Sequence, residues 1–106
     1  MKVIFHPDAE AELAEATQRY DNARDGLGRE FETAVELRIN EVVRDPSSWP
    51  QVKRTVRRVR ILRFPYDLLF KEEQDTLFIL ALFHHHRQPG YWWDRIHDIQ
   101  SPGDAN

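Results

Sequence analysis

The first half of the chain repeats apolar positions with the period of an α-helix. After His6-Pro7-Asp8, apolar residues recur every three or four positions, with acidic and amide residues between them. Proline suits the first turn of a helix, and aspartate there suits the positive end of the helix dipole. A second apolar stripe of the same period begins near Gly28 and ends at Asp45-Pro46. The pattern therefore predicts two amphipathic helices joined by a glycine-rich turn, which together form a helical hairpin.

Outside these helices the pattern changes to short apolar or β-branched runs that are typical of strands. They cover residues 2–5, 56–64, 66–71 and 76–83. Pro65 and the polar residues 72–75 separate the last three runs, and links this short favour an antiparallel meander. The resulting order is β-α-α-β-β-β. We expect an α+β fold in which a small, mostly antiparallel sheet has the helical hairpin on one face, and in which a short C-terminal segment follows the last strand.

A chain of 106 residues has the size of one domain, and we assign that domain to residues 1–98 and a flexible tail to residues 99–106. The absence of cysteine excludes a disulfide framework and a thiolate metal site. No run is apolar and long enough to serve as a signal peptide or a membrane span. We therefore expect a cytoplasmic protein that does not associate with membranes.

Charge is distributed unevenly along the chain. The net charge at pH 7 is −3 and the isoelectric point is about 5.9, yet residues 46–71 include seven basic residues and one acidic residue. The basic residues are Lys53, Arg54, Arg57, Arg58, Arg60, Arg63 and Lys71. Such a cluster is typical of a site for a polyanion or an acidic protein partner. Taken singly, each arginine can equally pair with a helix glutamate or cover apolar sheet surface with its stem.

The meander predicts where this basic block lies. In an up-down-up arrangement, the strands at 56–64 and 76–83 point the same way and are separated by one strand, so their C-terminal ends lie about 10 Å apart. Arg60 and Arg63 then meet the run His84-His85-His86-Arg87, and Tyr66 begins the strand between them. The strand register, and with it the face that each side chain occupies, is left open by the sequence.

The histidine run is compatible with several kinds of chemistry. His84 and His86 have the spacing of a metal chelate on a strand, but two ligands do not make a site, and we expect neither a metal nor another cofactor. RNA cleavage by attack of the 2′-hydroxyl needs a base, an acid and a cation at the phosphate, which histidine and arginine can supply without a metal. This hypothesis assigns those roles to His84 or His85 with Arg87, Arg63 and Arg60. The simplest alternative is a polar strand end whose imidazoles are solvated.

The apolar residues near the C-terminus indicate a surface for a partner. The runs 66–71 and 76–83 have apolar residues on both strand faces, and two helices can cover only one face. We expect the other face to form an exposed apolar patch, which would mark a binding surface. Tyr91-Trp92-Trp93 is typical of packing at the end of a small core and less so of base stacking. The residues assigned to partner binding are Arg57, Arg58, Arg60, Tyr66 and Trp92.

Four stretches together resemble the RelE/ParE superfamily of bacterial toxins, and more narrowly its ParE-like branch, often labelled plasmid stabilisation proteins. They are FHPDAEAELAEATQRYD, GLGREF, RRVRILRFPYDLLFK and LALFHHHRQPGYWWDR, and the similarity spans roughly residues 1–95. The resemblance implies a compact toxin encoded beside an antitoxin. It also implies a hetero-oligomer, in which the antitoxin wraps an extended or helical segment around the open surface of the toxin.

The resemblance implies two modes of action. RelE-like members are metal-independent ribonucleases that cut mRNA on the ribosome, and ParE-like members inhibit DNA gyrase and are not nucleases. We predict the toxin component of a type II toxin–antitoxin pair, with gyrase or a similar target favoured, because the ribonucleases are usually basic and this chain is acidic. The alternatives are a ribonuclease, the one reading in which the protein is an enzyme, and an inactive toxin fold that serves as an interaction module. On the ribonuclease pattern the matching positions are Arg60, Arg63, His84, His85, Arg87 and Tyr91.

Overall fold

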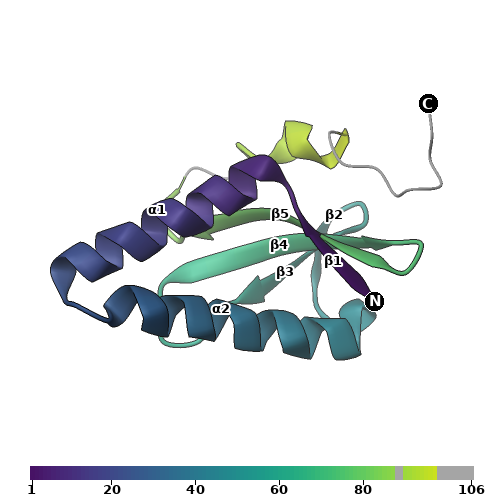
Figure 1. The fold of residues 1–106 in the computed structure, drawn as a ribbon. Coiled ribbons are helices and arrows are strands. Elements are labelled where there is room, and N and C mark those ends of the chain that lie inside the picture. The colour runs from purple at the N-terminus through teal and green to yellow at the C-terminus, as the bar shows by residue number, and fades with distance from the viewer. Residues whose placement is uncertain (88–89, 98–106) are drawn as a thin grey trace.

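A five-stranded sheet forms the centre of the molecule, and two long helices lie together across one of its faces (Figure 1). The computed structural model describes residues 1–87 and 90–97. The predicted α+β fold with a helical hairpin is confirmed, with one additional strand, β2. In chain order the elements are β1 (Lys2–Phe5), α1 (Pro7–Ala23), α2 (Leu27–Arg44), the 3-10 helix η1 (Pro46–Ser48), β2 (Gln51–Lys53), β3 (Val56–Arg60), β4 (Tyr66–Glu73), β5 (Thr76–His84) and the 3-10 helix η2 (Trp93–His97).

The helical hairpin forms where the apolar stripes predict it. At the start of α1 the His6 imidazole accepts a hydrogen bond from the Asp8 backbone N–H over 3.0 Å, which caps the helix. Gly26, at φ +89°, turns the chain into α2 in a conformation that glycine adopts without strain. The two helices approach so closely that a Cβ atom on Gly28 would lie 2.5 Å from the Thr17 carbonyl oxygen. The glycine-rich turn thus sets both the direction and the closeness of the hairpin.

The strands follow the order β1-β5-β4-β3-β2 across the sheet. Strands β3, β4 and β5 form the predicted antiparallel meander, and β1 pairs parallel with β5 at one edge. At the other edge β2 pairs with β3; this strand was not predicted, because its three residues are all exposed and have no apolar pattern. The predicted meeting of strand ends is confirmed: Arg60 pairs with Asp67, and Tyr66 pairs with His84.

Each face of the sheet has its own apolar core. The larger core lies between the helices and the sheet. Its centre is a cluster of aromatic rings from both helices, β4 and the loop before β4, formed by Tyr20, Phe31, Phe64 and Tyr66. The smaller core lies on the opposite face and contains Leu69, Phe78 and Leu80. Because successive strand residues alternate between faces, β4 and β5 are buried along most of their length.

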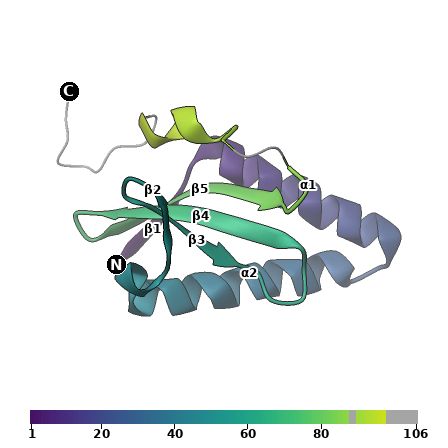
Figure 2. The same ribbon diagram turned by 180° about the vertical axis from the view of Figure 1, so that it is seen from behind.

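The predicted exposed apolar patch on the second face is wrong, because the C-terminal segment covers it. Trp92 is only 8% exposed and belongs to the smaller core. Figure 2 shows η2 lying along β5 on the side away from α2. The Lys71 ammonium donates to the Ile96 carbonyl oxygen over 3.2 Å, and the Lys53 ammonium lies 3.5 Å from the centre of the Trp93 ring. The adjacent tryptophans therefore pack as predicted, and they cover the smaller core on this face.

Two further expectations concern the end of β3 and the C-terminal tail. The strand predicted at 56–64 ends at Arg60, and Arg63 has φ +75° in the loop before β4. The tail predicted at residues 99–106 lies outside the described residues. Among the helices that the structure describes, none combines the length and the apolar character needed to cross a membrane.

Candidate functional site

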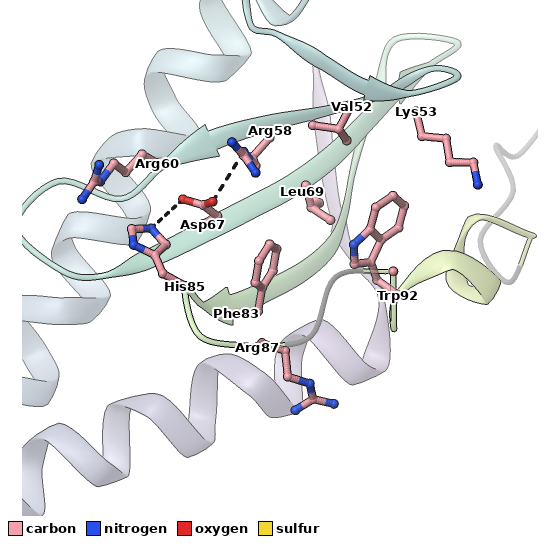
Figure 3. A pocket seen from close by; sticks show the side chains of 11 residues that line it. Val52, Lys53, Arg58, Arg60, Asp67, Leu69, Phe83, His85, Arg87 and Trp92 are labelled. Carbon is pink, nitrogen blue, oxygen red and sulfur yellow. Dashed lines mark hydrogen bonds and ion pairs between the residues drawn. The ribbon is translucent and has the colours of Figure 1, made fainter.

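A groove of about 640 Å³ lies on the sheet face that turns away from α2. Figure 3 shows strands β3, β4 and β5 beneath it, with the β2–β3 hairpin and the C-terminal segment at its borders. Apolar side chains line the groove at Val52, Leu69, Phe83 and Trp92, and cationic side chains line it at Lys53, Arg58, Arg60 and Arg87. A groove with this lining is complementary to a partner that is both apolar and acidic.

One carboxylate, that of Asp67 on β4, lies at the centre of the groove. Its Oδ1 atom is 3.0 Å from Nε2 of His85, and its Oδ2 atom is 3.5 Å from Nε of Arg58 (Figure 3). The register explains this meeting, since Asp67 pairs with Arg60 on β3 and with Phe83 on β5, which places the side chains two positions away on the same face. Asp67 was not singled out from the sequence. It is the one acidic residue in the basic block 46–71, which is the signal that could have found it.

Within the part of the chain that the structure describes, the remaining cations of the groove have no carboxylate partner. Among the described residues, none of Lys53, Arg60 and Arg87 forms an ion pair. The groove therefore has an excess of positive charge, which would steer an acidic partner toward it. Figure 3 shows the Arg87 side chain turned toward α1, so this residue lies at the rim.

A second, smaller pocket of about 280 Å³ lies between α1 and the C-terminal end of β5. It is lined by four residues that were singled out from the sequence, namely Tyr66, His84, Arg87 and Tyr91. Arg19 of α1 also lines it and donates a hydrogen bond from Nη2 to the Tyr66 hydroxyl over 2.5 Å. Arg19 was missed because, in the sequence, it is one polar residue among many on the outer side of a helix. Its position opposite the histidine run depends on how α1 lies on the sheet.

Burial and neighbouring charges shift the pKa values of two side chains in this pocket, His84 and Tyr91. Desolvation, followed by the nearby His86, His85 and Arg19, lowers the pKa of His84 below its ordinary value. Both effects favour the neutral form of His84. Desolvation and the hydrogen bond from the Tyr91 hydroxyl to Glu12 raise the pKa of Tyr91, so this phenol stays protonated. The Tyr91 hydroxyl consequently donates its hydrogen bond to Glu12 and has no second proton to offer a ligand.

Other candidates lie away from both sites. Arg63 forms an ion pair with Glu30 of α2, with 3.0 Å between Nη2 and Oε1. Arg57 donates from Nη1 to the Trp49 carbonyl oxygen over 2.6 Å, on the helix side of the sheet. The groove thus brings together Arg58, Arg60, His85, Arg87 and Trp92, the second pocket brings together Tyr66, His84, Arg87 and Tyr91, and Arg57 and Arg63 join neither set. The roles assigned to these residues stay predictions.

The histidine run does not form a metal centre within the described chain. His84 Nδ1 accepts a hydrogen bond from the His86 backbone N–H over 3.1 Å, and the two imidazole rings lie edge to face with 4.8 Å between their centres. In residues 1–87 and 90–97, no group of three or more histidine, aspartate or glutamate side chains is arranged to hold a metal ion.

The chain folds into a small α+β protein with a basic groove on one sheet face, and comparison with known proteins identifies its family. Residues 3–89 match the family described as "ParE toxin of type II toxin-antitoxin system, parDE". Because this match covers most of the chain, the protein belongs to the ParE toxin family, as the sequence resemblance predicted. No curated protein matches the sequence significantly.

A solved structure supports the same fold. It is titled "Chromosomal ParDE TA system from P. aeruginosa", and it aligns with a TM-score of 0.70 at 15% sequence identity. The alignment covers 79% of this chain and 95% of that chain. At this identity the likeness concerns the arrangement of the backbone, and it agrees with the sheet and hairpin described above.

Proposed function

We propose that this protein is a growth-inhibiting toxin that acts by binding its target, with DNA gyrase as the favoured target, and that a cognate antitoxin blocks it. Membership of the ParE family supports the toxin assignment. The observation that supports action by binding is that the predicted catalytic residues lie in different places and do not form one site. His85 and Arg60 line the groove, His84 and Tyr91 line the second pocket, and Arg63 is bound to α2.

The groove itself is better suited to a protein than to a scissile phosphate. The Asp67 carboxylate occupies the position between Arg58 and His85 where a phosphate would have to approach both groups. A carboxylate there repels a phosphate and shares the cations that would stabilise it. The apolar lining by Leu69, Phe83 and Trp92 offers instead a place for the side chains of a protein segment.

The same groove supports the proposal of an antitoxin partner. Its cationic residues without a carboxylate partner favour an acidic segment, and its apolar lining favours an amphipathic one. The structure from P. aeruginosa is titled as a ParDE toxin–antitoxin system, which is in line with a paired antitoxin here. We propose that the antitoxin segment enters the groove and that toxin and antitoxin form a hetero-oligomer.

The proposal is tested by inducing the protein without an antitoxin and by adding the purified protein to a gyrase supercoiling assay. We expect growth arrest, inhibited supercoiling and unchanged 5′ ends of mRNA. The double variant R58Q/R60Q removes two groove cations and should weaken both inhibition and antitoxin binding at least tenfold. Arg29→Gln, at an exposed position of α2, is the matched control and should behave like the wild type. Normal growth together with normal supercoiling would refute the toxin proposal and leave an interaction module.

One observation favours a second candidate function, the metal-independent ribonuclease. His85 is held by the Asp67 carboxylate at 3.0 Å, an arrangement that orients an imidazole for proton transfer, and Arg58 and Arg60 lie on the same sheet face. This candidate predicts that His85→Ala abolishes toxicity while thermal unfolding stays normal. It also predicts new 5′ ends at codon-specific positions in mRNA, with normal supercoiling. Toxicity that persists in the variant H85A/R87A would exclude it.

A further inference from the structure

The pocket between α1 and the end of β5 contains three hydrogen-bond donors that converge from different elements. Arg19 comes from α1, His84 ends β5, and Arg87 follows it in the next loop. Together with the Tyr66 hydroxyl they line a space of about 280 Å³. The groove proposed for the antitoxin lies on the other side of β5, and Phe83 and Arg87 border both spaces.

Each donor is held in place by a contact that leaves other donor positions available. Arg19 uses one N–H of Nη2 on the Tyr66 hydroxyl, and a guanidinium has further N–H groups. His84 accepts the His86 N–H at Nδ1, so in the neutral ring the proton is on Nε2. The Arg87 guanidinium lies 4.0 Å from the centre of the Tyr91 ring. Donors fixed in this way lose little conformational entropy when a ligand binds.

Two arginines and two carboxylates line the pocket, and one of these carboxylates is already paired with Arg95. Arg19 and Arg87 have no ion-pair partner among the described residues, and Arg19 is not paired with Glu15 one helical turn away. The Glu12 carboxylate also lines the pocket, but Arg95 neutralises it by binding both of its oxygens. Glu15 is the remaining carboxylate. A ligand with one negative charge would therefore neutralise the site.

We propose that this pocket binds a single carboxylate of a partner protein, an aspartate or glutamate side chain or a chain terminus. A guanidinium can donate two parallel hydrogen bonds to the two oxygens of a carboxylate. The hydrogen bond to the Tyr66 hydroxyl orients the Arg19 guanidinium in the pocket. A nucleic-acid backbone fits less well, because α1, which forms one wall, has five acidic residues and one basic residue. The site adjoins the proposed groove at Phe83 and Arg87 and adds a second anchoring point for a protein.

The electrostatic state of His84 agrees with this assignment. Desolvation lowers its pKa most, and the neighbouring His86, His85 and Arg19 lower it further, as positive charges near an imidazole do. An anion bound beside the ring would reverse part of that effect. The pKa of His84 is therefore a direct probe of whether the pocket is filled.

The test is an NMR titration of the full-length protein with acetate at constant ionic strength. The His84 ring signal is assigned by its loss in His84→Gln, and the proposal expects acetate to shift it saturably and to raise its pKa. Arg19→Gln should weaken acetate binding at least tenfold, and Arg29→Gln is the matched control that should bind as the wild type does. Arg87→Gln gives an independent second variant with the same expected loss, because it leaves the contact between Arg19 and Tyr66 intact.

Three results would overturn the assignment. One is an acetate titration that leaves His84 unchanged, and another is wild-type acetate affinity in a folded R19Q or R87Q variant. The third is binding of inorganic phosphate at least ten times tighter than acetate near pH 6, where phosphate is mostly a monoanion, because this would identify a phosphate ligand. The titration involves neither gyrase nor antitoxin, so its failure would leave the proposed function unaffected.

Discussion

Glu12 of α1 and Arg95 of η2 form a two-pronged ion pair, in which Nη1 and Nη2 of Arg95 lie 2.9 and 3.0 Å from the two carboxylate oxygens. The carboxylate also accepts hydrogen bonds from the Leu82 backbone N–H and the Tyr91 hydroxyl, and Arg95 donates to the Leu80 carbonyl oxygen. These β5 groups lie beyond the stretch that pairs with β1. The ion pair therefore takes the place of a neighbouring strand and anchors the C-terminal segment.

Replacing Glu12 with glutamine should destabilise the protein and loosen the C-terminal segment. Arg95 would lose its charge partner in a position where its side chain is 12% exposed, and we expect a loss of about 2–4 kcal/mol in the free energy of unfolding. Urea unfolding measures the loss, and tryptophan fluorescence reports whether Trp92 and Trp93 become exposed. Glu15→Gln, one turn further along α1, is the control and should change stability by less than about 0.5 kcal/mol. Equal effects of the two variants would contradict the anchoring role.

Gly28→Ala should destabilise the protein, although alanine is the better helix former. In an exposed helix the substitution gains about 1 kcal/mol. Here the new Cβ atom would lie 2.5 Å from the Thr17 carbonyl oxygen and 2.8 Å from an Asp21 oxygen, so the two helices must move apart. We expect a net loss of about 1–3 kcal/mol, measured by thermal or urea unfolding. Glu32→Ala, on the exposed face of α2, serves as the control and should be nearly neutral. A more stable G28A protein would show that the hairpin adjusts without cost.

Tyr91→Phe should make the protein less sensitive to alkaline pH. The pKa of Tyr91 is raised in the folded state above the ordinary value of 10.0, so the phenol stays protonated there after it has ionised in the unfolded chain. Its contribution to stability is fully present below pH 10 and is lost as the pH rises toward the folded pKa. At pH 8 the variant should lose about 1 kcal/mol with the hydrogen bond to Glu12. Between pH 8 and pH 11 the free energy of unfolding, measured with urea, should therefore decrease less for the variant than for the wild type. Parallel declines would refute the prediction.

Glu30→Gln should reduce the loss of stability in acid. Hydrogen bonds from Arg63 and Arg24 lower the pKa of Glu30 in the folded state below its ordinary value of 4.5. The stabilisation from these contacts is present above pH 4.5 and is lost as the pH falls through the folded pKa. The variant lacks this titration, so its stability should change less between pH 6 and pH 3 than that of the wild type. Because the carboxylate is solvent-exposed, the difference should shrink further at high salt, which thermal unfolding at two salt concentrations can check.

The helices and the meander could be predicted because their residues repeat with clear periods and short links leave few ways to connect the strands. The place of β1 beside β5 could not be predicted, since it depends on which edge of the sheet α1 reaches. The cover over the second sheet face was missed for a related reason. Trp92 and Trp93 were correctly expected to pack, but the partners that hold the segment, Glu12 and Lys71, are far away in the sequence.

The sequence predicted which residue types gather at this end of the sheet, but it did not predict how they divide between the two pockets. The meeting of the basic strand and the histidine run is correct, but neighbouring strand residues point to opposite faces, so His84 and His85 enter different pockets. The register that decides between them is set by contacts across the sheet. Arg63 was placed on a strand that ends three residues earlier, and its left-handed backbone turns it toward Glu30.

The parallel pairing of β1 with β5 has a consequence for the making of this toxin. Lys2 pairs with Thr76 and Phe5 with Ile79. The first strand to be translated therefore cannot pair until β5, which is translated much later, has been synthesised. Closing so long a loop is slow, because its entropy must be lost before the contacts form. The groove also needs β5 beneath it. A fragment that ends before Thr76 would therefore have neither the complete sheet nor the groove.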